Sequence, residues 1–347
     1  MTGKRDLSLF VALAIVWGTA FGAIEVGLAT LPPILFAALR LDVATLLFTA
    51  GIAVYGLEWR PRTRDDWIAI GVGGVLLVGG HYGLLFLGQS HVSSAVAAIV
   101  LSLTPVVTPP LAIAVLPQER LRAPAAVGLL LGLAGVIVVA LSGGSLGGQA
   151  VGVVLLFAAA FVFALGSVLI ERAEETLPVV PLQTWAMGVG ALALHGLSYV
   201  HPGESVPAAS AWTSTTIAAL AYLGVVATAG GFLAYFVLLD RIGASQLSLV
   251  SYASPVVAAL VGWALLGETI TLATIGGFGL IVLGFALCKI GALWKTAGPV
   301  VGYGPHRPTG AIADDDPDRW VVDRNGNAYV AASGRGAEGR TSAPGAD

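Results

Sequence analysis

The chain has 347 residues, of which 56% are apolar and 11% charged, against about 25% charged residues in an ordinary soluble domain. So few charges cannot cover a water-facing surface, which excludes a soluble globular enzyme. The 17 Lys and Arg residues leave a net charge of -3 and form no basic face, which excludes nucleic acid as a partner. The single cysteine, Cys288, permits no intramolecular disulfide and no cysteine-based metal site. The composition predicts a protein of the lipid bilayer without metal or cofactor.

Apolar stretches recur along the chain at close to the length of about 20 residues that a helix needs to cross the hydrocarbon core. Ten are recognised, in order Leu7–Leu28, Ile34–Leu57, Trp67–Leu87, Ala95–Leu116, Ala125–Leu141, Val151–Ile170, Pro181–Val200, Ile217–Leu239, Leu247–Leu266 and Leu272–Ile290. The first could pass for a signal peptide, but it lacks a convincing small-residue cleavage site. The sequence therefore predicts an all-α membrane protein with ten transmembrane helices.

Basic residues fall on one side of these predicted spans. Short loops rich in Lys and Arg stay in the cytoplasm. With the N-terminus inside, the inner segments contain Lys4, Arg5, Arg60, Arg62, Arg64, Arg120, Arg122, Arg172, Arg241, Lys289 and Lys295. The outer loops, 29–33, 88–94, 142–150, 201–216 and 267–271, contain none. We therefore expect a multi-pass protein of the inner cell membrane with both termini in the cytoplasm.

Residues 296–347 have a different composition, rich in Gly, Pro, Asp and Arg, with an acidic run from Asp314 to Asp318. Asn325-Gly326 lies between two short alternating segments, Trp320–Asp323 and Ala328–Ala331, which is a hairpin signal. A lone two-stranded hairpin is only marginally stable in water. We predict a cytoplasmic, mostly disordered acidic tail.

The two halves of the membrane part carry the same features in the same order. Leu103-Thr104-Pro105-Val106-Val107, followed by Glu119, recurs as Ala253-Ser254-Pro255-Val256-Val257, followed by Glu268, and Gly18-Thr19 recurs as Gly166-Ser167. An odd number of spans in each half turns the second copy upside down, as in many secondary transporters. The sequence thus predicts two inverted five-helix repeats, residues 1–146 and 147–295, with a substrate site near the midplane between them.

Several of these motifs resemble a known family. They are Trp17-Gly18-Thr19-Ala20-Phe21-Gly22, Pro32-Pro33-Ile34-Leu35-Phe36-Ala37-Ala38-Leu39-Arg40, and the pairs Pro105/Glu119 and Pro255/Glu268. Over about residues 7–293 the chain resembles the EamA-type carriers of the drug/metabolite transporter superfamily. The resemblance implies a ten-helix fold of inverted repeats and the export or exchange of small metabolites, often amino-acid-like or drug-like. The family often has a basic residue where this chain has Glu25, so an anion-binding role is not transferred to that position.

Ionisable side chains inside the predicted spans are the main candidates for a site: Glu25, Arg40, Asp42, His81 and His195. Each costs about 2.5 to 3.5 kcal/mol at a helix centre unless it is paired or faces water. Glu25 and Arg40 flank the tight turn at Pro32-Pro33 at similar depth, so we predict that they form a charge pair, with Asp42 as the alternative partner. Substrate binding or proton coupling is expected there, whereas the histidines could simply bond a backbone carbonyl.

Hydroxyl, aromatic and proline residues complete the candidate site. Ser102, Thr104, Ser251 and Tyr252 precede the two paired prolines and could offer hydroxyls to a substrate or join helices. Trp17 and Tyr82 could stack on a substrate or anchor the membrane interface. Pro105 and Pro255 each remove a backbone donor within a helix, so we predict local breaks that flank the substrate site and act as hinges. The small-residue spacings Gly79/Gly83 and Gly128/Gly132 predict close helix packing.

Motifs of other chemistry lack their usual context. Gly143–Gly147 matches the GxSxG pattern of hydrolases but lies in a short loop with no strand before it. The acidic run imitates a calcium loop, yet Arg319 stands where that loop needs glycine and Asn325 where it needs glutamate. The chain contains no GxxxxGK[ST] motif, so a gradient rather than its own ATPase would drive transport.

The sequence as a whole predicts a secondary transporter, not an enzyme, that moves a small amino-acid-like or drug-like metabolite by alternating access, as an exporter. A membrane-embedded lipid-modifying enzyme and a membrane scaffold or sensor acting through the tail are the alternatives. The expected partners are a small-molecule substrate and the lipid bilayer, with a proton as the candidate coupling ion and a homodimer left open. Substrate, direction and coupling ion are not specified by these residues.

Overall fold

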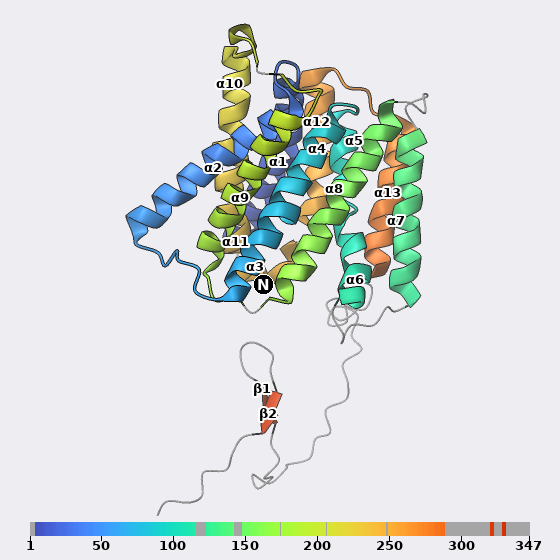
Figure 1. Cartoon of the computed structure of the whole chain (residues 1–347). Coiled ribbons are helices and arrows are strands. Elements are labelled where there is room, and N and C mark those ends of the chain that lie inside the picture. Colours follow the sequence, from blue (N-terminus) through green and yellow to red (C-terminus); the bar gives the residue numbers. More distant parts are fainter. Residues whose placement is uncertain are drawn as a thin grey trace, which may run out of the picture. The chain divides into compact units, whose positions relative to one another are not determined.

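The computed structural model describes residues 4–115, 123–141, 148–173, 175–205, 207–247, 249–288, 320–322 and 328–330. The chain separates into two units, Met1–Lys295 and Thr296–Asp347. Helices make up the elements of the first unit and lie together as a bundle (Figure 1). The predicted all-α membrane part is confirmed at this level.

Both halves of the first unit consist of helices that follow one another closely in the chain. The first half contains α1 (Lys4–Leu28), α2 (Pro33–Tyr55), α3 (Arg64–Val72), the π-helix η1 (Gly73–Gly80), α4 (His81–Gln89), α5 (Ser94–Leu101), α6 (Thr104–Val115) and α7 (Ala123–Leu141). The second half contains α8 (Gly148–Glu171), α9 (Val179–Val200), the 3-10 turn η2 (Ala209–Ala211), α10 (Ser214–Ala221), the π-helix η3 (Tyr222–Gly230), α11 (Gly231–Leu247), α12 (Val250–Leu266) and α13 (Leu272–Cys288). Each predicted span coincides with one of these helices or with a consecutive run of them.

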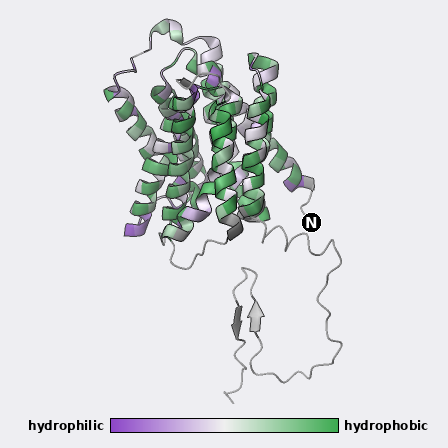
Figure 2. Ribbon diagram, turned by 90° about the vertical axis from the view of Figure 1, so that its right-hand side faces the viewer, coloured by the Kyte–Doolittle hydropathy of each residue, from purple (hydrophilic) through white to green (hydrophobic). Residues whose placement is uncertain are grey.

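Six of the helical runs are long and apolar enough to cross a membrane: Arg5–Leu28, Pro33–Tyr55, Arg64–Gln89, Ser94–Ala112, Gln149–Glu171 and Ser214–Leu239. Three further apolar helices are shorter, Ala126–Leu141, Val250–Leu266 and Leu272–Leu287. Apolar residues predominate along the helices, and hydrophilic ones gather mainly near helix ends (Figure 2). The bundle therefore has the surface of a multi-pass membrane protein, while the number of ten crossings stays a prediction.

Carboxylates from distant loops hold two of the helix N-termini. Glu204 accepts hydrogen bonds from the backbone N–H groups of Ile34 and Leu35 at the start of α2. Glu268 accepts from the N–H of Ser94 at 2.8 Å and from its hydroxyl at 2.9 Å at the start of α5. A helix begins with N–H groups that have no partner within the helix, and negative charge is favourable there. These two contacts join each helix start to a loop of the other half.

The start of α3 is fixed in the same way. Thr63 and Asp66 form a reciprocal capping box, and Asp66 is fully buried. The Asp66 carboxylate also accepts from the N–H groups of Thr176 at 2.6 Å and Leu177 at 3.2 Å, in the connection between α8 and α9. Because four backbone donors share this one carboxylate, it ties the two connecting segments together.

The third helical run of each half contains a π-helical segment, η1 in one and η3 in the other. In η3 the hydroxyl of Thr228 donates to the carbonyl of Leu223, five residues earlier, at 2.7 Å. Such wide turns leave carbonyls available to side chains and are frequent at functional sites. They fall at matching positions of the two halves, which apolar periodicity alone did not predict.

The expected break before Pro105 is present, but the one at Pro255 is not. The helix ends at Leu101 and resumes at Thr104, so that the fourth predicted span consists of α5 and α6. By contrast α12 runs without interruption through Pro255, which lies in its second turn. Pro255 removes only the single N–H that would bond the carbonyl of Ser251, and the helix continues past it.

The second unit contains a short antiparallel pair, β1 (Trp320–Val322) and β2 (Ala328–Val330), with Val321 opposite Tyr329. The hairpin signal around Asn325-Gly326 is thereby confirmed. The predicted disorder of the tail, its acidic run, Glu119 and the GxSxG segment all lie outside the described residues.

Candidate functional site

Arg40 lies deep in the bundle, 4% exposed, on the face of α2 that meets the second half of the chain. Its Nε donates a hydrogen bond to the hydroxyl of Thr228 in η3 at 2.6 Å. The guanidinium lies 4.6 Å from the ring centre of Tyr82 and 6.0 Å from that of Phe86, both on α4. Cation–π contact stabilises a desolvated arginine by about 2 kcal/mol. One charged group therefore joins α2, α4 and η3.

The predicted pair between Glu25 and Arg40 is not formed. Arg40 bonds Thr228 instead, and no described carboxylate lies within 4.0 Å of its guanidinium. Asp42 is not the alternative partner either, because residues two apart on a helix lie on nearly opposite sides. Its carboxylate pairs with His195 Nε2 of α9 at 2.7 Å, and both side chains are more than a third exposed. Equal depth along two helices did not mean that the side chains share a face.

Glu25 lies in a different cluster, with Gln89 of α4 and Glu268 near enough to interact electrostatically. Gln89 is 1% exposed, and its amide nitrogen donates to the carbonyl of Phe21 at 2.6 Å. Two oxygens of this cluster, Glu25 Oε2 and Gln89 Oε1, are buried without a hydrogen-bond partner among the described residues. Buried acceptors are normally satisfied, so an unmatched pair points to a proton or another bound donor at this place. Glu268, which the sequence marked only as the end of a repeated motif, belongs to this cluster.

His81 and Tyr82 follow directly after η1. The His81 ring donates from Nδ1 to the carbonyl of Ala159 in α8 at 3.1 Å, which is the simpler of the two roles expected of the histidines. Its ring packs 4.9 Å from Phe163. Tyr82 is 9% exposed and lies against Arg40, so it is a buried contact rather than an anchor at the membrane interface. His81 thus joins the two halves of the chain, whereas Tyr82 supports Arg40 within the first half.

Trp17 also lies inside the bundle. Its indole N–H donates to the carbonyl of Ala227 in η3 at 3.1 Å, and its ring stacks on Tyr235 of α11 with 5.6 Å between centres. Two residues further along α1, the Thr19 hydroxyl bonds the Tyr222 hydroxyl at the start of η3. The first helix is therefore held by polar contacts at two places along η3.

The hydroxyls near Pro105 serve the broken helix itself. Ser102 donates to the carbonyl of Ile99 at 2.6 Å and Thr104 to that of Leu101 at 2.8 Å. The second copy differs, since the Tyr252 ring packs 4.4 Å from Phe285 and Ser251 is partly buried. The hydroxyls of Ser102 and Thr104 therefore hold the ends of the break together and do not extend the Arg40 cluster.

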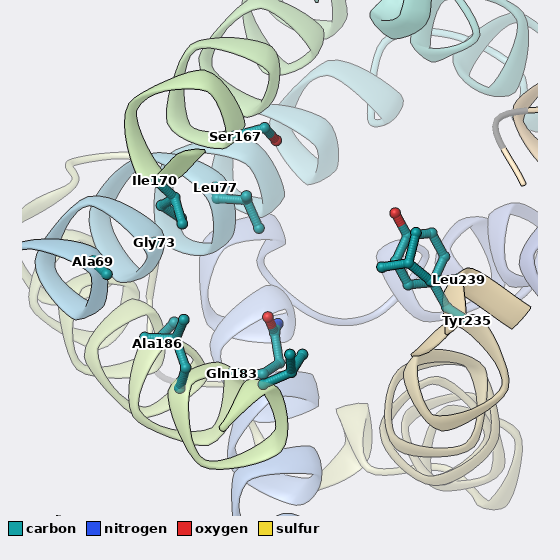
Figure 3. A pocket seen from close by; sticks show the side chains of 11 residues that line it. Ala69, Gly73, Leu77, Ser167, Ile170, Gln183, Ala186, Tyr235 and Leu239 are labelled. Carbon is teal, nitrogen blue, oxygen red and sulfur yellow. The ribbon is translucent and has the colours of Figure 1, made fainter. Parts of the chain in front are cut away.

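A pocket of about 270 Å³ lies between four helical runs (Figure 3). It is lined by Ala69, Gly73, Leu77, Ser167, Ile170, Val179, Leu182, Gln183, Ala186, Tyr235 and Leu239. The Ser167 hydroxyl donates to the carbonyl of Phe163 at 2.9 Å. The amide nitrogen of Gln183 is buried and has no partner in the described part of the chain, and the amide points toward the middle of the pocket (Figure 3).

The predicted candidates do not line this pocket, and Gln183 and Tyr235 were missed. The sequence analysis looked mainly for charged residues and therefore did not select Gln183 or Tyr235. Gln183 could have been found, because a glutamine within an apolar span is unusual. Tyr235 links the pocket to the predicted site, because it stacks on Trp17. Among the described residues, no group of three or more His, Cys, Asp and Glu side chains could hold a metal ion.

Comparison with known proteins finds relatives along most of the chain. The model of the EamA-like transporter family matches twice, over residues 5–141 and 150–289. An uncharacterized transporter of Archaeoglobus fulgidus is 32% identical over 269 residues, covering 77% of this chain and 92% of that protein. An Escherichia coli K12 protein named "Uncharacterized inner membrane transporter YedA" is 30% identical, covering 87% of this chain and 97% of that protein. A Salmonella typhimurium protein named "Probable amino-acid metabolite efflux pump" is 30% identical, covering 83% and 96%.

A solved crystal structure shares the fold, with a TM-score of 0.57, 23% identity and coverage of 84% of this chain and 98% of that one. The homologues are named as transporters or efflux pumps, and together with the apolar helices they indicate a multi-pass transporter of the cell membrane rather than an enzyme. The twofold match of the family model covers most of the chain, and the protein belongs to the EamA-like transporter family.

Proposed function

We propose that the protein is a secondary transporter that exports a small metabolite by alternating access between two inverted five-helix halves, residues 1–146 and 147–295. The observation that carries this proposal is the Arg40 cluster. Arg40 of the first half bonds Thr228 of the second, and Trp17 bonds Ala227. Hydrogen bonds of this kind can be exchanged for hydrogen bonds to a substrate when the halves move. A purely apolar contact between the halves would not allow such an exchange.

The duplication supports the inverted arrangement. The family model matches each half once, and the π-helical segments η1 and η3 occupy corresponding places in the two matches. Ten crossings, five in each half, would turn the second copy upside down. The boundaries of the two halves follow from this interpretation of the duplication, with the tail as a separate cytoplasmic segment.

The pocket fits the loading side of an exporter. Ile170 lies near the end of α8 and Val179 at the start of α9, both at helix ends for which the basic loops predict a cytoplasmic position, and Ala69 lies in the second turn of α3. A substrate arriving from the cytoplasm would meet this pocket before it meets the stack of Trp17 and Tyr235. Release on the other side would then require that stack and the Arg40 cluster to open.

The proposed orientation leads to a first prediction. In a variant with Cys288 replaced by alanine, a single cysteine at exposed Arg62 should not react with an impermeant thiol reagent added to intact cells, because the loop faces the cytoplasm. A cysteine at exposed Ser205 should react strongly. Both positions should react after the cells are broken, which serves as the control. Labelling of Arg62→Cys but not Ser205→Cys in intact cells would reverse the orientation.

The paired prolines lead to a second prediction. Pro105 follows the break between α5 and α6, and the segment around Pro255 packs on Gly18 of α1, where an added Cβ would lie 2.7 Å from the Ser254 carbonyl. If both places bend during alternating access, the double change to alanine should leave expression intact but lower transport turnover several-fold. Pro181→Ala, in the first turn of α9 where proline is well tolerated, is the matched control. Unchanged turnover in the double variant would rule out the hinge role.

The transport function itself is tested by comparing metabolites released from cells with and without the protein. The Salmonella relative is named for amino-acid metabolite efflux, so amino acids and their relatives are the first compounds to measure. At least one small metabolite should accumulate faster outside the expressing cells. Deleting residues 296–347 should leave this release intact, whereas loss of release on deletion would favour a scaffold or sensor acting through the tail. Equal release of every measured metabolite would contradict the proposal.

A further inference from the structure

We infer that the substrate is a small carboxylate with an apolar body, and that Arg40 receives its carboxylate group. The inference rests on the proposed transport function and adds the class of substrate. Two observations on the described residues carry it: a buried guanidinium without an acidic partner, and a pocket whose unmatched polar atom is a hydrogen-bond donor. Both need an acceptor that the described residues do not supply.

The charge of Arg40 is not balanced by the described part of the protein. A buried charge is normally paired, because its desolvation is otherwise uncompensated. Other described acids make contacts elsewhere: Asp42 with His195, Glu204 at the start of α2, Glu268 at the start of α5, and Glu25 in the cluster with Gln89 and Glu268. The Thr228 hydroxyl accepts a hydrogen bond from the Nε of Arg40 only, and the Tyr82 ring covers one face of the guanidinium. The two terminal nitrogens have no hydrogen bond to the described residues, so they can form a forked pair with a carboxylate.

The pocket favours the same class of ligand, but through a neutral hydrogen-bond donor that binds more weakly than a charged one. Its walls are mainly apolar, with Leu77, Ile170 and Leu239 among them, and they suit an aliphatic or aromatic body. The buried amide nitrogen of Gln183 has no acceptor among the residues that the structure describes. A ligand oxygen would satisfy it. A volume of about 270 Å³ is just below the range of roughly 300 to 1,000 Å³ typical of ligand pockets, which limits the substrate to a small molecule.

A short chain of contacts connects the pocket with Arg40. Tyr235 lines the pocket and stacks on Trp17, the Trp17 indole bonds Ala227, and the next residue, Thr228, bonds Arg40. The stack separates the two places in this conformation. A carboxylate that first binds at Gln183 reaches Arg40 once the stack opens, and it then replaces Thr228 or joins it.

A single monoanion fits better than a phosphate. A phosphate ester carries up to two negative charges at neutral pH and is usually held by several cationic or N–H groups. Arg40 is the one described arginine or lysine in this cluster, and the neighbouring His81 uses its Nδ1 on a backbone carbonyl. One guanidinium with one neutral amide matches one carboxylate.

Three probes of the same apolar body separate the possibilities: leucine, 4-methylpentanoate, which lacks the amino group, and leucinamide, which lacks the carboxylate. The purified full-length protein is mixed with each probe, and binding is measured as a rise in the temperature of unfolding and as quenching of tryptophan fluorescence. We expect leucine and 4-methylpentanoate to bind and leucinamide to bind at least tenfold more weakly, because a charge-assisted hydrogen bond is lost. Arg40→Gln should weaken the two carboxylates at least tenfold and leave leucinamide unchanged.

Arg62→Gln is the matched control, because Arg62 is exposed and pairs only with Glu58 among the described residues, 2.9 Å away. It should bind all three probes as the wild type does. If Arg40→Gln does not fold, Arg40→Lys replaces it, since lysine keeps the charge but not the fork, and a smaller loss for carboxylates alone is expected. Equal binding of leucinamide and leucine, wild-type carboxylate binding in both Arg40 variants, or no binding of either carboxylate would overturn the inference. Release of neutral or cationic metabolites from expressing cells would leave the transport function standing while this inference fell.

Discussion

Replacing Gly277 with leucine is expected to prevent the folding of most of the protein. Helices α7 and α13 lie side by side (Figure 1). An added Cβ at Gly277 would lie 2.7 Å from the carbonyl oxygen of Gly135 and 2.5 Å from a methyl group of Val139. Backbone atoms cannot move aside as a flexible side chain can, so the two helices must separate along their length. Overpacking costs about 1 to 3 kcal/mol even where side chains can adjust, and the loss here should be at the upper end or beyond.

The same helix provides the control for this change. Gly276 and Gly279 lie close to Gly277 along α13, and an added Cβ at either meets no described atom within 4 Å. Leucine at these two positions should leave the yield of monodisperse protein and its unfolding temperature close to the wild-type values. Gly277→Leu should lower the yield at least tenfold, since about 1.4 kcal/mol already corresponds to a factor of ten. Equal yields for the three variants would show that α7 and α13 are not in backbone contact.

The physical reason for this sensitivity is the membrane environment. Lipid tails are as apolar as leucine, so helices in a bilayer associate through close packing rather than through removal of apolar surface from water. The predicted packing role of the small-residue spacings is confirmed, since an added Cβ at Gly132 would lie 2.6 Å from Leu103 and one at Gly83 would lie 2.9 Å from Leu194. Spacing alone did not identify the contact between Gly135 and Gly277, because it says nothing about which helices are neighbours.

Helix positions were predictable because the length of an apolar run is a property of the local sequence. Departures from regular helix were not equally predictable. The break at Ser102 and Leu103 could be anticipated from Pro105, but the same argument failed at Pro255, where α12 continues through the proline. The π-helical segments have no such marker in the apolar pattern, although within η3 the Thr228 hydroxyl bonds the carbonyl of Leu223 five residues earlier.

For the candidate site, the sequence identified the ionisable residues within the membrane spans but not the side chains that they contact. Arg40, Glu25 and Asp42 were singled out because an ionisable group in a membrane needs compensation. Depth along the helix was the basis for pairing Glu25 with Arg40, yet the rotation of each helix decides what a side chain faces. Thr228 and Gln89, the observed neighbours, are uncharged and lie far away in the chain. Such contacts need a three-dimensional arrangement of the helices before they can be proposed.

Glu25→Gln is expected to stop transport driven by a pH gradient while leaving exchange at equal pH intact. The argument begins with two buried oxygens, Glu25 Oε2 and Gln89 Oε1, that have no hydrogen-bond partner among the described residues, although the Gln89 side chain lies beside Glu25. A proton carried by Glu25 would supply the missing donor, and the Glu268 carboxylate nearby adds to the electrostatic field at the site. Glutamine has nearly the same shape as glutamate but cannot take up and release a proton, so binding and movement of the halves should persist without coupling.

The measurement uses proteoliposomes with a metabolite that the wild-type protein transports. With an imposed pH gradient, Glu25→Gln should reduce the initial rate at least tenfold, whereas exchange of labelled for unlabelled metabolite at equal pH should stay within twofold of the wild type. Glu58→Gln is the matched control, since Glu58 is exposed and pairs with Arg62 at the surface, and both of its rates should be unchanged. Loss of both activities in Glu25→Gln would assign Glu25 to binding or folding rather than to coupling. Gradient-driven transport at the wild-type rate would show that a different group carries the proton, and the unmatched oxygens would then mark a place where the substrate itself donates a hydrogen bond.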